Sequence, residues 1–244
     1  MIEARQLTKV FRDKKRGEIR AVDGVSFRCQ PGQVFGLLGV NGAGKTTCLR
    51  LLGTILQPSS GTASVAGFDV VSEPDRVRAH IGFLSTATAL YGRLTAQETV
   101  EYFGRLHGLP EDLLRQRLDG LFATLDMNEF RHRRCDQLSS GMKQKVSIAR
   151  TLVHDPPVMI FDEPTHDLDV LTARTVINFI RDCRARGKTV IFSTHVMREA
   201  EKLCDTIAII HQGRIMAEGT LAQLRERTGA QDLEDVFVGV VEAK

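Results

Sequence analysis

The sequence of 244 residues lacks the features typical of disulfide-rich, zinc-binding, membrane-spanning and secreted proteins. Its five cysteines are an odd number, and they form neither a CxxC pair nor a cluster with histidines along the chain. A disulfide framework or a zinc site is therefore not expected, and a reducing cytosol fits. The apolar stretches, such as that at 34–40, are far shorter than the roughly 20 residues that span a bilayer. Charges near the start stand where a signal peptide needs an apolar run, so we expect a chain that does not enter the membrane by itself.

A strong net charge is absent as well. The 33 Lys and Arg residues exceed the 30 Asp and Glu residues by a formal charge of only +3. Because proteins that bind nucleic acids present a basic surface to the phosphate backbone, this small balance predicts no nucleic-acid partner. The sequence shows no internal repeat, and its 42% of hydrophobic residues indicates a globular fold with a sizeable core.

Hydrophobic patterning then separates strands from helices. Residues 2–29 alternate apolar and polar side chains around a charged turn at 12–18, which predicts an antiparallel hairpin. Short, mainly apolar runs at 33–38, 158–161 and 189–192 alternate with helical patterns. This alternation is typical of a parallel sheet that is covered on both faces, and it predicts an α/β fold.

A mainly helical stretch interrupts the predicted sheet. Thr95 and Glu98 have the capping-box spacing of a helix start. We expect a helical subdomain at about 88–155, inserted into the α/β core. Residues 1–220 would form the main domain, and 221–244 a C-terminal extension.

A glycine-rich segment follows the first buried strand and matches the pattern GxxxxGK[ST]. Its glycines let the backbone wrap closely around phosphates, and successive N–H groups would form an anion nest beside the positive end of the next helix. Lys45 is expected to reach the β- and γ-phosphates during hydrolysis, and the Thr46 hydroxyl to bind Mg²⁺. The predicted nucleotide-binding residues of this loop are Gly39, Val40, Asn41, Gly42, Ala43, Gly44, Lys45, Thr46 and Thr47.

Two acidic residues, Asp162 and Glu163, follow the predicted strand at 158–161. Ligands of parallel α/β sheets bind at the carboxyl ends of the strands, so Asp162 is placed to hold Mg²⁺, directly or through water. Glu163 would be the base that activates the attacking water. His195 follows another strand, from which it would touch a γ-phosphate. The alternatives, an acidic turn and a structural histidine, are less favoured beside the glycine-rich loop.

A segment with the sequence LSSGM looks like the LSGGQ signature of ABC transporter ATPases. Its residues are Leu138, Ser139, Ser140, Gly141 and Met142. An ordinary Ser-capped helix is the alternative interpretation. The glycine-rich loop, this segment, the acidic strand end, a D-loop-like Asp169 and a switch-like His195 follow in the family's order. Over roughly residues 2–220, the sequence therefore resembles the nucleotide-binding subunits of ABC transporters.

The resemblance implies a P-loop NTPase (RecA-like) core with an antiparallel β subdomain and an inserted α-helical subdomain. It implies that the chain binds ATP and Mg²⁺ and hydrolyses ATP. Two cassettes would pack head to tail, with each ATP between the phosphate loop of one and the signature of the other. A homodimer is expected, with a homologous cassette as the alternative. An integral membrane permease would hold the chain at the cytoplasmic face of the membrane.

Several positions depart from the family's pattern. Thr86 stands in the Q-loop slot of a glutamine, where its shorter side chain would need an extra water, or a neighbouring residue would take its role. Ser140 and Met142 replace Gly and Gln, although the two presumed phosphate-facing signature residues are kept. Asp167 replaces a small residue and would either repel a partner or pair with an arginine. Phe11 is the predicted adenine-stacking residue, with a core position as the alternative.

Two segments, 89–95 and 232–237, look like those of subunits that serve ABC-2-type exporters, including sodium-exporter and drug-exporter ATPases. We therefore expect export of sodium ions or drug-like molecules through a separate permease. The alternative is a soluble ABC ATPase that acts on ribosomes or DNA. A single cassette, the absence of a heptad run and the low net charge favour the transporter subunit.

Overall fold

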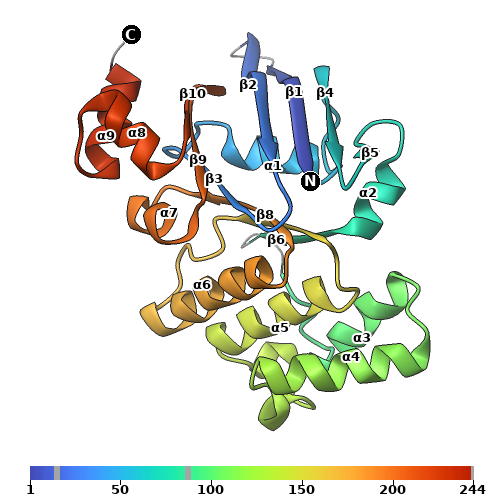
Figure 1. The fold of residues 1–244 in the computed structure, drawn as a ribbon. Coiled ribbons are helices and arrows are strands. Elements are labelled where there is room, and N and C mark those ends of the chain that lie inside the picture. Colours follow the sequence, from blue (N-terminus) through green and yellow to red (C-terminus); the bar gives the residue numbers. More distant parts are fainter. Residues whose placement is uncertain (14–16, 86–88, 243–244) are drawn as a thin grey trace.

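The structure is a computed structural model that describes residues 1–13, 17–85 and 89–242. It has an α/β fold with two sheets and a helical lobe below them (Figure 1). In the described part, no helix has the length and apolarity that a membrane crossing requires.

The central sheet brings the predicted apolar runs side by side. Its strands lie in the order β10-β9-β3-β8-β7-β6, in which all described pairs are parallel except β9 with β10. Every residue of β3, β7 and β8 is buried, as expected for strands covered on both faces. The predicted parallel sheet is thus confirmed. Its strands are β3 (Val34–Leu38), β6 (Ile81–Ser85), β7 (Val158–Asp162), β8 (Thr189–Thr194), β9 (Thr206–His211) and β10 (Arg214–Gly219).

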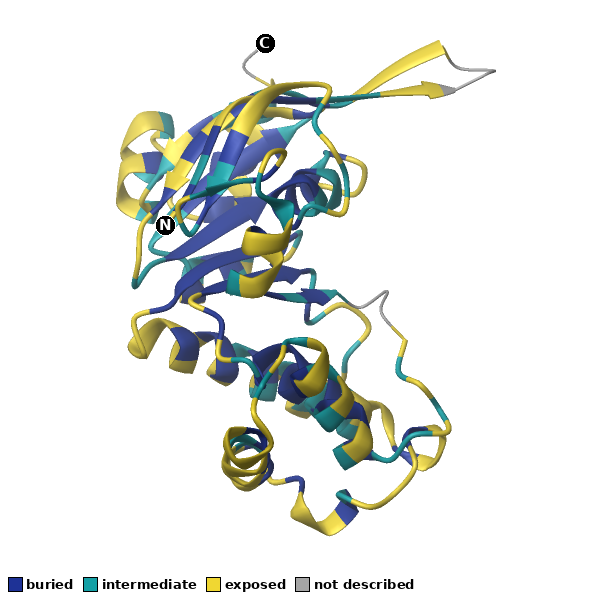
Figure 2. Cartoon of the chain, turned by 90° about the vertical axis from the view of Figure 1, so that its right-hand side faces the viewer, coloured by how far each residue is buried: buried dark blue, intermediate teal, exposed yellow. Residues whose placement is uncertain are grey.

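The predicted hairpin is part of a second, antiparallel sheet in the order β2-β1-β4-β5. Helix α1 (Lys45–Leu52) packs with both sheets in one hydrophobic cluster, so one face of the central sheet is covered by a helix and by another sheet. Figure 2 shows this buried interior between exposed outer surfaces. The strands of the antiparallel sheet are β1 (Ile2–Asp13), β2 (Gly17–Cys29), β4 (Ser60–Val65) and β5 (Phe68–Asp69).

Helices cover the opposite face of the central sheet. Phe161 and Phe192 point into this face and are fully buried in a cluster with the helical lobe. Burial of one such side chain stabilises the fold by about 1.5–3 kcal/mol. The predicted capping box is confirmed, because the Glu98 N–H donates to Thr95 Oγ1 at 3.1 Å and the Thr95 N–H donates to Glu98 Oε2 at 2.8 Å. The helices of this face are α3 (Ala96–Leu106), α4 (Glu111–Thr124), α5 (Ser140–Leu152) and α6 (Val170–Ala185).

The end of the chain packs onto the β9–β10 edge of the central sheet. Leu233, Val236 and Phe237 are buried in a cluster with Ile207 and Ile209 of β9. The division between a main domain and an extension at residue 220 stays a prediction. The remaining helices are α2 (Pro74–His80), α7 (Met197–Leu203), α8 (Leu221–Thr228) and α9 (Leu233–Glu242).

Candidate functional site

The site forms where four parallel strands of the central sheet end. The register pairs Leu38 of β3 with Thr194 of β8, and Asp162 of β7 with Ser193 of β8. On the other side of β7, Ser85 of β6 pairs with Asp162. Because the strands are parallel, their carboxyl ends and the residues that follow them lie at one edge of the sheet, as predicted.

The glycine-rich loop leaves β3 at this edge and ends at α1. Gly42 and Gly44 have φ angles of 81° and 107°, which residues with a Cβ rarely adopt. A Cβ on Gly44 would also lie only 2.2 Å from the carbonyl oxygen of Ala21 in β2. The second glycine of the motif is therefore required both by its backbone angle and by the close approach of a neighbouring strand.

Lys45 is buried at the centre of the loop, with 4% of its side chain exposed. Its Nζ donates to the carbonyl oxygens of Gly39 at 2.7 Å and Val40 at 3.1 Å. The same ammonium group lies 2.9 Å from Glu163 Oε1. A buried ammonium needs partners for its protons, and these three oxygens fix it beside the loop.

Asp162 and Thr46 meet at the predicted metal position. The Thr46 hydroxyl donates to Asp162 Oδ1 at 3.0 Å, and the Ser193 hydroxyl donates to the same oxygen at 2.9 Å. A carboxylate and a hydroxyl are hard oxygen donors, and Mg²⁺ prefers such donors. These two side chains therefore fit Mg²⁺. In the structure they are joined by the hydrogen bond between the Thr46 hydroxyl and Asp162 Oδ1.

Glu163 occupies an unusual backbone position directly after β7. Its φ angle is 46°, in the left-handed region, and its N–H donates to the carbonyl oxygen of Ser193 at 3.2 Å and to the Ser193 hydroxyl at 3.0 Å. Residues held in this region are often found at functional sites. Here the turn aims the carboxylate back toward Lys45.

The carboxylate of Glu163 is ionised easily in this setting. Partial burial works to raise its pKa, but the hydrogen bond and charge of Lys45, followed by those of His195, outweigh burial and lower it below its ordinary value. His195 Nδ1 lies 3.0 Å from Glu163 Oε2. In the sequence, Lys45, Glu163 and His195 lie in a loop and after two separate strands. In the structure, Glu163 contacts both Lys45 and His195. A lowered pKa keeps the carboxyl group of Glu163 unprotonated near neutral pH.

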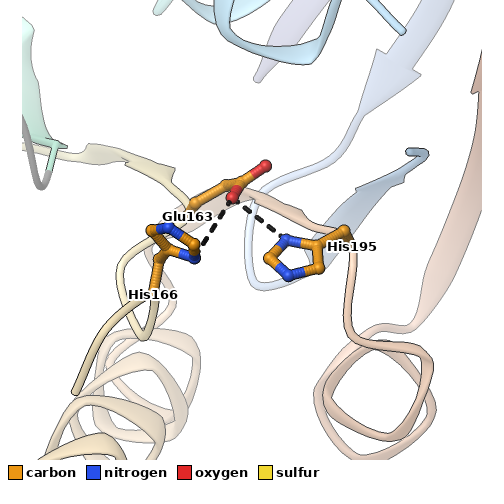
Figure 3. A group of neighbouring side chains, drawn as sticks. All are labelled: Glu163, His166 and His195. Atoms are coloured by element: carbon orange, nitrogen blue, oxygen red, sulfur yellow. Dashed lines mark hydrogen bonds and ion pairs between the residues drawn. The ribbon is translucent and has the colours of Figure 1, made fainter. Parts of the chain in front are cut away.

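A third basic side chain, His166, approaches the same carboxylate (Figure 3). Its Nδ1 lies 4.0 Å from Glu163 Oε2, and its Nε2 lies 3.4 Å from Asp167 Oδ2. The rings of His166 and His195 are 5.5 Å apart, centroid to centroid. Asp167 therefore lies beside a histidine of its own turn, and its predicted repulsion of a partner or pairing with an arginine stays a prediction.

Lys45, Thr46, Asp162 and Glu163 line a cleft of about 430 Å³. A larger cavity of about 710 Å³ lies between α4, α5 and α6, where charged groups such as Lys188 and Asp155 already pair at 2.6 Å. The smaller cleft is the candidate site because it alone joins the glycine-rich loop to the acidic strand end among the cavities of the described residues. It is lined by Ala21, Asn41, Gly42, Ala43, Gly44, Lys45, Thr46, Thr47, Arg50, Ser85, Asp162 and Glu163.

Other predicted residues lie outside this lining. Phe11 is 38% exposed on β1, with Lys9 Nζ 5.3 Å from its ring centroid, so it is not a core residue and its role toward adenine stays a prediction. Gly39 and Val40 contribute carbonyl oxygens to Lys45. Thr86 lies outside the described residues.

The signature segment is separate from the phosphate cleft. Ser139 caps α5 by accepting a hydrogen bond from the Met142 N–H at 3.3 Å. Gly141 faces Thr172 of α6, where a Cβ would lie 2.9 Å from the threonine hydroxyl. Asp169 caps α6 by accepting from the Leu171 N–H at 3.0 Å. Within this chain, the capping bonds thus give Ser139 and Asp169 structural roles.

Sequence reasoning missed Ser193, His166, Ala21, Arg50 and Ser85. Ser193 directly follows the apolar run at 190–192 on the strand that leads to His195, and this position is a signal that the sequence carries. Ala21 of β2 and Ser85 of β6 line the cleft from strands distant along the chain, and Arg50 lies one helical turn after Thr46 on α1. His166 approaches Glu163 from the turn after β7.

A glycine-rich phosphate loop with a buried lysine, set at the carboxyl ends of parallel strands beside Asp162 and Glu163, defines a P-loop NTPase. The family model described as "ABC transporter" matches residues 22–166. The chain belongs to the ABC transporter family, as an ATP-binding subunit that hydrolyses ATP.

Relatives of known name are similar over nearly the whole chain. The ABC transporter ATP-binding protein NatA of Bacillus subtilis (strain 168) is 41% identical over 98% of this chain and 97% of its own length. The daunorubicin resistance ATP-binding protein DrrA3 of Streptomyces coeruleorubidus is 38% identical over 92% of this chain and 71% of its own length. Both support the predicted resemblance.

Solved structures share the fold. An ATP-binding subunit of an ABC transporter matches with a TM-score of 0.88 at 28% identity over 99% of both chains. A dimer of the ATP-binding cassette MJ0796 in a post-hydrolysis state, bound to ADP and Pi, matches with a TM-score of 0.81 at 26% identity, over 91% of this chain and 99% of that one. The predicted P-loop fold is confirmed.

Proposed function

We propose that this chain uses Glu163 as the base of ATP hydrolysis and drives export through a separate membrane permease. The observation that carries the catalytic part is the meeting of Lys45, Thr46, Asp162 and Glu163 in one cleft. The loop and Lys45 hold the phosphates of ATP, and Thr46 and Asp162 hold Mg²⁺. When bound, Mg²⁺ would neutralise charge on the phosphates.

The ionised Glu163 accepts the proton of the attacking water, and His195 fixes the orientation of the carboxylate through the contact at 3.0 Å. A contact of His195 with the γ-phosphate also belongs to this proposal. Asp162 is held by two hydroxyl groups, so it stays at the strand end while Glu163 acts. In this proposal Asp162 holds Mg²⁺, and the neighbouring Glu163 accepts the proton.

The site is completed by a second cassette in this proposal. The signature at Ser139 and Gly141 lies outside the phosphate cleft, and Val170 and Leu171, which follow Asp169, are 83% and 75% exposed. Exposed apolar side chains at one place favour a protein contact. The dimeric structure of the cassette MJ0796 supports pairing of two cassettes. In the proposed head-to-tail arrangement, Ser139 and Gly141 reach the partner's ATP. A homodimer is the simplest form.

Trapping a dimer tests this catalytic assignment. Glu163→Gln removes the base and keeps the shape, so it should bind ATP, lose about 10²- to 10⁴-fold in turnover, and form an ATP-dependent dimer in analytical ultracentrifugation. Adding Gly141→Asp should prevent that dimer, because a carboxylate would repel the partner's phosphates. Turnover of Glu163→Gln at the wild-type rate would exclude Glu163 as the base.

Export is proposed because segments 89–95 and 232–237 resemble those of ABC-2-type exporter subunits, and because one relative is named a daunorubicin resistance protein. Sodium ions or drug-like molecules are the proposed cargo, and the cytoplasmic face of the membrane is the proposed location. Purification from detergent-solubilised membranes should recover an integral membrane protein that stimulates ATP turnover when the two are reconstituted. Recovery with ribosomes or DNA, and no such membrane protein, would favour the soluble alternative.

A further inference from the structure

Glu163, His166 and His195 lie together although they come from the segments that follow two different strands. Glu163 and His166 lie in the turn that follows β7, and His195 follows β8. One potential ligand atom of each side chain lies within 4.8 Å of the other two. Figure 3 shows both imidazole rings directed toward the carboxylate.

The spacing of these atoms suits a metal ion. A tetrahedral zinc ion with bonds of about 2.0–2.2 Å holds neighbouring ligand atoms about 3.3 Å apart. In the structure, Glu163 Oε2 lies 3.0 Å from His195 Nδ1 and 4.0 Å from His166 Nδ1. All three atoms lie within 4.8 Å of one another, so side-chain rotations that move them by about 1 Å would bring them onto one ion.

We propose that Glu163, His166 and His195 form a binding site for a divalent transition-metal ion of the zinc class. Two imidazole nitrogens and one carboxylate oxygen supply three ligands, and water supplies a fourth. Mg²⁺ prefers oxygen ligands, so this site differs in chemistry from the position between Thr46 and Asp162. No zinc site is expected from the sequence, because its cysteines and histidines form no cluster along the chain.

The proposed metal site is accessible from solvent and lies beside one positive charge. His166 and His195 side chains are 44% and 36% exposed, which gives an ion access from solvent. Lys45 Nζ lies 2.9 Å from the other carboxylate oxygen of Glu163, and its positive charge weakens binding of a cation. The site is therefore a reversible one rather than a permanent structural centre.

Occupation of this site regulates hydrolysis. An ion bound to Glu163 Oε2 takes the lone pair that would accept the proton of water, and it removes His195 from the carboxylate. The regulatory part rests on the proposed role of Glu163 as the base, whereas the metal site itself does not.

Metal binding is measured first without nucleotide, on tag-free full-length protein. The affinities of the wild type and of His166→Gln are compared in two titrations. Binding of Co²⁺ is followed by its visible absorption, and binding of Zn²⁺ is followed by calorimetry. The matched control is His132→Gln, which replaces an exposed histidine in the helical lobe. We expect one ion per chain, with affinity reduced at least about tenfold in His166→Gln and unchanged in His132→Gln, since even supporting residues of metal sites contribute that much.

Inhibition is measured next, at saturating Mg-ATP and buffered free Zn²⁺, with each rate divided by the metal-free rate of the same variant. His166→Gln should need at least about tenfold more free Zn²⁺ for half-inhibition. If the wild type and His166→Gln bind each metal ion with the same affinity, the proposal is overturned, even if ATP hydrolysis proceeds normally. Tight binding that depends on His166 in a chain without ATPase activity would support the metal site and contradict the proposed function instead.

Discussion

The ammonium group of Lys45 and the carboxylate of Glu163 form an ion pair at 2.9 Å across the phosphate cleft. Both side chains are mostly buried, at 4% and 18% exposure. In the structure Lys45 therefore contacts the residue that is the proposed base. The phosphates of ATP would compete with Glu163 for this lysine, so nucleotide binding would release the carboxylate toward water.

Lys45→Ala should weaken ATP binding by about 10- to 100-fold, since hydrogen bonds to charged groups contribute about 1.5–3 kcal/mol. Calorimetric titration with a nonhydrolysable ATP analogue measures the change. Lys202→Ala, which replaces an exposed lysine on α7, is the control. Unchanged affinity in Lys45→Ala would mean that the loop does not hold the phosphates in the proposed way.

Thr46→Ala should raise the Mg²⁺ concentration needed for half-maximal ATP turnover by about tenfold or more, because it removes an oxygen donor beside Asp162. Thr46→Ser keeps the hydroxyl and should retain the Mg²⁺ dependence of the wild type. If alanine and serine behave alike, Thr46 does not hold the metal.

Gly44→Ala should unfold the protein at a lower urea concentration than Gly42→Ala. Both glycines have positive φ angles, so each alanine is strained by about 1–2 kcal/mol. At Gly44 the new Cβ would also meet the carbonyl oxygen of Ala21 at 2.2 Å, whereas at Gly42 no atom lies within 4 Å. If the free energy of unfolding falls equally in the two variants, the close contact with Ala21 does not destabilise Gly44→Ala.

Asp69→Asn should destabilise the protein at neutral pH and have little effect near pH 2. Hydrogen bonds from the Thr62 hydroxyl and the Ser72 and Val71 N–H groups lower the pKa of Asp69 to about 2. A carboxylate with a lowered pKa stabilises the fold above its unfolded pKa of about 3.9, and this contribution is lost as the pH falls toward 2.

Urea unfolding of Asp69→Asn and wild type between pH 7 and pH 2 tests this dependence. Asp75→Asn, which removes a carboxylate that is 91% exposed, is the control for a general effect of charge. A difference between Asp69→Asn and wild type that stays constant down to pH 2 would contradict the lowered pKa.

The sequence by itself determined the phosphate loop, the order of strands and helices and the capping box. These features depend on residues within a few positions of one another, so Gly44, Lys45 and Thr46 or Thr95 and Glu98 are readable as local patterns. The apolar runs also predicted the parallel sheet, because strands buried on both faces need continuous hydrophobicity. The position of Asp162 and Glu163 followed from the strand that ends before them.

Only the tertiary structure decided which side chains share the cleft. The register of β7 with β8 brings Ser193 to Asp162, and the left-handed backbone at Glu163 turns its carboxylate toward Lys45 and His195. It also decided that an antiparallel sheet and α1 together cover one face of the core. Such contacts join residues distant along the chain, and strand pairing and turn geometry set them rather than composition or spacing.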